Sequence, residues 1–258
     1  MSIITQLFVH PVKGLTPQAE TQVSLQSGHG ILGDRAFALM YATSTSKSNS
    51  RVVPWMKKRN FAMQCDLPAL AALDCRYDFQ NALLTIKHKD QDLLVADPNI
   101  LAQRKLIDAF FTGYLAADLK SPLQLVGTND GKTRYPDRHT VHLSLINQAT
   151  LDQLSDIVGQ PVDAKRFRPN IVFQGIPAWA EFNWIGQHFQ LGSAQIEVTA
   201  PINRCLNIDV NPRTGKQDLP LLSLLQQHFS HKQTGVLAKV ITSGIVTVGD
   251  RLQSLNKY

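Results

Sequence analysis

The chain has 258 residues, 43% of them hydrophobic, which suits one large folded domain or two small ones and excludes a disordered chain. Its net charge is +6 without a run of five basic residues, so the charge suits a phosphorylated small molecule better than nucleic acid. Three cysteines are too few for a disulfide framework, and because there is neither a signal-like start nor an apolar stretch of about 18 residues, we expect a cytoplasmic protein with no membrane partner.

Short β-forming runs dominate the first ninety residues. A glycine-rich turn over 28–35 leads into the second of these runs, and a polar, Ser/Thr-rich stretch over 43–49 is typical of a loop between strands. The predicted strands of this region are 3–9, 36–41 and 82–87.

A helix is predicted over 98–115. Asp97 is a suitable N-cap and Pro98 suits the first helical position. The helical period then puts four apolar side chains on one face, namely Ile100, Ile107, Phe111 and Tyr114.

The second half alternates strands with two more helices. Asn147 can cap a helix over 148–158 that Gly159 ends, and a further helix fits 219–229. Predicted strands cover 123–126, 171–174, 188–191, 194–199, 236–241, 244–248 and 251–255. Because strands and helices do not alternate regularly, the pattern predicts a mainly β, barrel-like α+β protein in two parts.

Several polar motifs carry little functional weight. The segment 127–133 resembles a phosphate-binding loop but is one residue short between its glycines. The pairs His139/His142 and His228/His231 have metal-ligand spacing but no evident third ligand, which favours ordinary histidines. Cys65 and Cys75 lie in an apolar segment, and we interpret them as buried, inert thiols.

Cys205 differs from the other cysteines in its surroundings. Pro201 ends the preceding strand, so Cys205 should lie on a loop, where the neighbouring Arg204 favours the thiolate. A thiolate suits a soft metal or a nucleophilic role, and an ordinary free cysteine is the alternative. Arg166, Arg168 and Asn170 precede the strand 171–174. They indicate either an anion-binding site or ordinary solvent-exposed residues at the start of a strand.

Two groups of motifs resemble a known family. The first resembles the MOSC domain, the C-terminal domain of molybdenum cofactor sulfurase, and comprises Phe-Arg-Pro-Asn at 167–170, Arg-Cys at 204–205, Asn-Pro-Arg-Thr-Gly at 211–215 and the closing residues 244–250. The second comprises Pro-Val-Lys-Gly at 11–14, just after His10, and Gly-Asp-Arg at 33–35. It resembles the N-terminal β-barrel domain that precedes MOSC in the mitochondrial amidoxime reducing component and its bacterial relatives.

The resemblance implies a division of the chain and a set of site residues. It implies an N-terminal MOSC β-barrel domain over 1–95, a helical connection over 96–120 and a MOSC β-barrel domain over 121–258, with the site between them. It also implies that Cys205 is the catalytic residue and the metal ligand. The cofactor-binding residues that it implies are Lys13, Arg35, Thr140, Arg168, Asn170 and Arg204. The placement of Thr140 is the least secure of these.

The implied function is that of a molybdenum-dependent oxidoreductase. The molybdenum cofactor is an anion, which the basic residues complement, and the substrate would be a small N-hydroxylated compound. Without a Cys-rich iron–sulfur tail, electrons would come from a separate ferredoxin, flavodoxin or cytochrome b5-like protein. The alternatives are sulfur transfer by a Cys205 persulfide, a non-catalytic carrier of the cofactor, and a nucleic-acid-binding protein. Gly14 and Asn203 stand where relatives often have serine.

Overall fold

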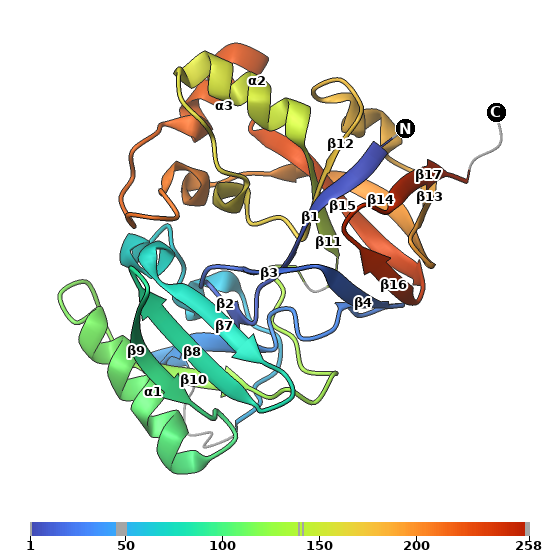
Figure 1. Ribbon diagram of the computed structural model, residues 1–258. Helices are drawn as coiled ribbons and strands as arrows, with labels where there is room; N and C mark the ends of the chain where they lie inside the picture. The colour runs from blue at the N-terminus through green and yellow to red at the C-terminus, as the bar shows by residue number, and fades with distance from the viewer. Residues whose placement is uncertain (1, 45–50, 139, 141, 256–258) are drawn as a thin grey trace.

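The computed structural model describes residues 2–44, 51–138, 140 and 142–255, and its regular structure is mainly β, with three α-helices among these residues (Figure 1). This confirms the predicted mainly β, α+β class. His139 and most of the predicted loop over 43–49 lie outside the described residues.

Seven strands form a closed ring in the order β12, β11, β15, β14, β13, β17 and β1, and pairing of β1 with β12 completes the ring. All neighbours in the ring are antiparallel except β11 and β12. Closure leaves no free strand edge in the ring, and β3 (Gln18–Glu20) pairs additionally with β1. The seven strands are β1 (Ser2–Val9), β11 (Leu143–Asn147), β12 (Ile171–Gln174), β13 (His188–Leu191), β14 (Ala194–Asn203), β15 (Gln233–Thr242) and β17 (Arg251–Ser254).

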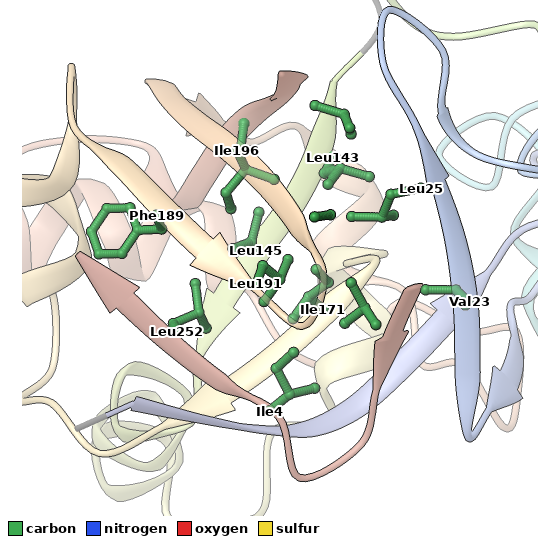
Figure 2. Packing of buried hydrophobic residues seen from close by; sticks show 14 of the residues in the cluster. Ile4, Val23, Leu25, Leu143, Leu145, Ile171, Phe189, Leu191, Ile196 and Leu252 are labelled. Atoms are coloured by element: carbon green, nitrogen blue, oxygen red, sulfur yellow. The ribbon is translucent and has the colours of Figure 1, made fainter. Parts of the chain in front are cut away.

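Apolar side chains from the ring meet in its interior (Figure 2). Strand residues alternate between the two faces of a sheet, so each strand sends every second side chain inward. Ile4, Ile171 and Leu191 are each at most 1% exposed there. A small sheet covers this core and adds Val23 and Leu25 to it; the sheet consists of β4 (Gln22–Gln26), β5 (Gly30–Ile31) and β16 (Gly244–Thr247).

The remaining strands form a second unit with its own core. One sheet contains β2 (Val12–Lys13), β6 (Phe37–Tyr41) and β10 (Leu123–Gly127). The other contains β7 (Asp74–Asp78), β8 (Leu83–His88) and β9 (Gln91–Ala96). Helix α1 (Leu101–Tyr114) contacts β9 and β10 and buries Ile107 and Phe111 in this core.

The start of α1 differs from the prediction. Asp97 accepts hydrogen bonds from the backbone of Asn99 at 2.7 Å and of Ile100 at 3.2 Å, so it closes a turn that includes Pro98, and the helix begins only at Leu101. Ile100 and Tyr114 are exposed, so the predicted four-residue apolar face was wrong at both ends.

The other two helices lie side by side against the barrel (Figure 1). Asn147 caps α2 (Gln148–Val158) by accepting from the backbone of Ala149 at 3.2 Å, and Gly159 ends the helix in a left-handed conformation, as predicted. Helix α3 (Leu221–Phe229) begins after Pro220. No helix in the described part of the chain is both long enough and apolar enough to cross a membrane.

Strand pairing crosses the predicted domain limits at both ends of the first part. The N-terminal strand β1, blue in Figure 1, belongs to the predicted first domain but pairs with C-terminal strands of the barrel. Strand β10 belongs to the predicted second domain but pairs with β6 in the second unit. The limits 95 and 121 stay a prediction. The chain passes between the two units several times, which places residues from both on the walls of one cleft.

Candidate functional site

A cleft of about 350 Å³ lies between the barrel and the second unit. Its wall from the second unit and the adjoining loops includes Arg35, Lys58 and Cys65. Its wall from the barrel includes Arg168 and, among other residues, Thr140, Asn170, Arg204 and Cys205. The structure therefore brings together six of the seven predicted site residues, with Lys13 just behind the wall.

Cys205 lies on a loop, as predicted, but Pro201 does not end the strand: β14 continues to Asn203, Pro201 pairs with Val236 within it, and Arg204 separates the strand from Cys205. Its thiol is half-buried, and its pKa is lowered to about 6, chiefly because the Cys65 thiol donates a hydrogen bond to it. The backbone N–H of Asn207 and the charge of Lys58 act in the same direction, whereas burial opposes them. These contacts favour the thiolate form of Cys205, which is the form that binds soft metals.

Arg204 holds the loop before Cys205. Its guanidinium donates to the backbone carbonyls of Thr234, at 2.9 Å from Nε, and of Phe167, at 2.8 Å, and it lies over the Phe167 ring at 5.3 Å. Burial lowers its pKa to about 9, and the charge of Cys205 opposes that shift. These contacts make Arg204 a positioning residue for Cys205, and no carboxylate accepts from it in the hydrogen bonds described.

Cys65 contradicts the expectation of an inert thiol. It is half-exposed, lines the cleft and contacts Cys205, while only Cys75, 1% exposed, is buried as predicted. Burial raises the pKa of Cys75 to about 12. The local sequence held no signal for Cys65, because its neighbours are apolar and its partner is distant in the chain.

Asp34 is a residue that the sequence analysis missed. It is completely buried and accepts hydrogen bonds from the backbone of His10 at 2.9 Å, from Arg134 at 2.7 Å and from Asn170 at 3.2 Å, and it also pairs with Arg35. The two arginines hold the pKa of Asp34 well below its usual range although burial opposes them. Its position between Gly33 and Arg35 in the recognised motif was the available signal.

Arg35 and Arg168 both have left-handed backbones, with φ of 56° and 51°. This conformation costs non-glycine residues about 1 kcal/mol or more and commonly marks functional sites. Arg168 donates to the carbonyl of Leu15 at 2.5 Å. Burial lowers its pKa to about 10.

Asn170 lies in the wall with its amide fully engaged. Its Oδ1 accepts from both the backbone N–H and the hydroxyl of Ser144, each at 3.1 Å. Its Nδ2 donates to Asp34 and to the carbonyl of Phe8 at 3.3 Å. Asn170 therefore joins the barrel to the Asp34 cluster.

Lys13 is buried behind the cleft and is not part of its lining. Its ammonium donates to the carbonyl of Tyr135 at 3.2 Å and pairs with Asp137, which does line the cleft. Burial lowers the pKa of Lys13, and the charge of Lys13 helps to lower that of Asp137 to about 2. Lys13 thus supports the segment from which Asp137 reaches the cleft.

The residues present fit an anionic group that contains a soft metal. Cations of the cleft and its wall outnumber the carboxylates Asp34, Asp137 and Asp218; they are Lys13, Lys58, Arg35, Arg134, Arg138, Arg166, Arg168 and Arg204. A surplus of buried and half-buried cations is stabilised by an anion. No group of three or more His, Cys, Asp or Glu in the described residues could hold a metal, so a metal at Cys205 must bring other ligands with it.

The remaining motifs lie apart from this site, with the exception of His142. Asp130 accepts from the backbones of Lys132 and Thr133 at 2.8 and 2.6 Å, so 127–133 is a turn closed by a side chain rather than a phosphate loop. His231 stacks on Phe229 and accepts from the backbone of Gln233 at 3.1 Å. His142 lines the cleft.

Comparison with known proteins gives a consistent family assignment. Residues 130–253 match the MOSC domain family. The chain is 25% identical over 299 aligned positions to mitochondrial amidoxime-reducing component 1 of Xenopus laevis, covering 97% of this chain and 81% of that protein. It is 23% identical to mitochondrial amidoxime reducing component 2 of Bos taurus, covering 83% and 68%.

Two further similarities are weaker in extent or in geometry. Molybdenum cofactor sulfurase of Caenorhabditis elegans is 34% identical over 91 residues, which cover 34% of this chain and 12% of that protein. The solved structure of the YUAD protein from Bacillus subtilis is 11% identical, with a TM-score of 0.49 over 98% of this chain and 96% of that one. Residues 130–253 are therefore similar to the MOSC domain, and the chain is similar in sequence to the amidoxime-reducing components over nearly its whole length.

Proposed function

We propose that the cleft binds the molybdenum cofactor, that Cys205 anchors its metal, and that the protein is an oxidoreductase for N-hydroxylated compounds such as amidoximes. The observation that carries the proposal is the position of the Cys205 thiolate in a cleft with surplus positive charge. A soft sulfur ligand beside several cations suits a metal held in an anionic organic group.

The residues of the chain have separate roles in this proposal. Arg35 and Arg168, which line the cleft, bind the anionic part of the cofactor, and Thr140 contacts it from the barrel side. Arg204 orients Cys205, and Lys13 and Asn170 position the walls through Asp137 and Asp34. When bound, the cofactor supplies two-electron chemistry at its metal, and the protein supplies orientation and charge.

The names of the relatives support the proposed reaction. Similarity to amidoxime-reducing components over most of the chain favours reduction of an N–O bond. The electrons would come from a separate ferredoxin, flavodoxin or cytochrome b5-like protein. The shorter similarity to a molybdenum cofactor sulfurase favours the second candidate, in which Cys205 carries a persulfide and transfers sulfur.

Elemental analysis of protein from a host that makes the cofactor tests the anchor. We expect near-stoichiometric molybdenum in the wild type and in Cys75→Ala, whose thiol is buried away from the cleft, and loss of most of the metal in Cys205→Ala. Benzamidoxime reduction with an electron donor should follow the metal content, because both depend on the same thiolate.

Other outcomes would redirect the assignment. Metal-free wild type with a persulfide on Cys205 would contradict the oxidoreductase and support sulfur transfer. Stoichiometric metal without benzamidoxime reduction would instead support a carrier of the cofactor.

A further inference from the structure

Cys65 and Cys205 form a pair of thiols in the cleft. Both are half-exposed, both line the cleft, and each thiol shifts the pKa of the other. The third cysteine, Cys75, is buried in the core of the second unit and does not line the cleft. Two cysteines in contact at a solvent-accessible site are the arrangement from which a disulfide forms.

Contacts around the two cysteines hold them together. The Asn207 amide donates to Oε1 of Gln64 at 3.4 Å, so the residue before Cys65 is bonded to the loop that carries Cys205. The segment before Cys65 also lies very close to Gly14, where an added Cβ would be 2.3 Å from the carbonyl oxygen of Ala62. The segments that carry the two cysteines are therefore held next to each other by the bond between Gln64 and Asn207.

We propose that Cys65 and Cys205 are a redox-active dithiol that closes to an intramolecular disulfide and so withdraws Cys205 from its role as metal anchor. The consequence for the metal rests on the proposed function, whereas formation of the disulfide does not. Both cysteines lie in loops, outside regular strands, where the backbone can adjust to the bonded sulfur separation of about 2.05 Å.

The oxidant is a low-molecular-weight disulfide such as oxidised glutathione. The Cys205 thiolate attacks one sulfur of that disulfide, forming a mixed disulfide and releasing one glutathione thiolate. The Cys65 sulfur, after losing its proton to solvent, then attacks Cys205 Sγ and releases the second glutathione. Two electrons pass from the protein thiols to glutathione, two protons end on the released thiols, and reduced glutathione reverses both steps.

The physical benefit of the pair is protection of an exposed thiolate. A thiolate without a nearby thiol is oxidised through sulfenic acid to sulfinic acid, which is not readily reversed. A neighbouring thiol captures the oxidised sulfur as a disulfide that thiols can reduce. The cofactor-free protein would thus keep Cys205 recoverable until a cofactor is bound.

The test treats cofactor-free protein with oxidised glutathione, quenches it with acid and maps its cysteines by peptide mass spectrometry without reduction. We expect wild type and Cys75→Ser to give one cross-linked peptide pair joining Cys65 to Cys205, with two thiols lost per chain. In Cys65→Ser the mixed disulfide has no resolving thiol, so a stable glutathione adduct should accumulate on Cys205.

A glutathione adduct on Cys205 of the wild type, with Cys65 still free, would overturn the proposal. This outcome is measured on the wild type and so does not depend on the folding of any variant. The outcome is separate from that of the proposed function. A disulfide in a protein that never acquires molybdenum would support the dithiol and reject the oxidoreductase. Stoichiometric molybdenum without any disulfide would reject the dithiol and leave the proposed metal anchor supported.

Discussion

Asp34 connects most of the charged groups on one side of the cleft. It is a single buried carboxylate that pairs with Arg35 and Arg134 and accepts from Asn170. Cutting one partner from a buried ion pair leaves the other charge without compensation, which is far costlier than losing an exposed pair. The geometry of the proposed cofactor cleft therefore depends on a residue that does not line it.

Asp34→Asn should lower the free energy of unfolding by about 3–5 kcal/mol, because two arginines lose their carboxylate. Urea titration monitored by circular dichroism measures this. The control is Asp92→Asn, which removes an exposed partner 2.8 Å from Lys87 and should cost less than about 1 kcal/mol. Equal effects of the two substitutions would contradict the role assigned to Asp34.

The same substitution should change the acid response. The pKa of Asp34 is lower in the folded protein than the usual value of about 3.9, so its stabilisation is present above that pH and is lost as pH falls toward the folded pKa. The wild type should lose urea resistance below about pH 4, and Asp34→Asn should lose less of it over that range.

At the scale of elements, Gly14 lets two segments of the second unit approach each other closely. Its φ is +86°, and a side chain there would meet the backbone of Ala62. The segment 61–65 can therefore approach β2 closely, and that approach brings Cys65 to the cleft.

Gly14→Ser should destabilise the protein and reduce the yield of the Cys65–Cys205 disulfide. The left-handed backbone costs about 1–2 kcal/mol, and displacement of the segment at Ala62 adds to that. Gly28→Ser is the matched control, because its φ is +72° and nothing lies within 4 Å of an added Cβ. The unfolding midpoint of Gly28→Ser should reflect backbone strain alone, and its disulfide yield should be unchanged. A full disulfide yield in Gly14→Ser would contradict this account.

At the scale of the whole molecule, the N-terminal strand completes the seven-stranded barrel. β1 pairs with β12 and β17, which lie in the C-terminal half of the chain. The barrel therefore cannot close until the first residues have found the last ones, and its core contains side chains from both ends of the sequence.

Ile4→Ala should lower the free energy of unfolding by about 2–5 kcal/mol, because Ile4 is 1% exposed in the barrel interior (Figure 2). Ile3→Ala, on the outer face of the same strand and 37% exposed, should change it by about 0.5 kcal/mol or less. Thermal and urea unfolding distinguish the two. Similar small effects would mean that β1 does not contribute to the barrel core.

Local patterns in the sequence determined the mainly β class, the cap and end of α2, the loop position of Cys205 and most of the residues that meet in the cleft. These features depend on neighbours in the chain or on motifs, so they can be read without coordinates. Only the tertiary structure decided that Cys65 contacts Cys205, that Asp34 holds the arginines, that Lys13 lies behind the wall and that β1 belongs to the barrel. Each of these is a contact between residues far apart in the sequence, which closure of the barrel and docking of the second unit create.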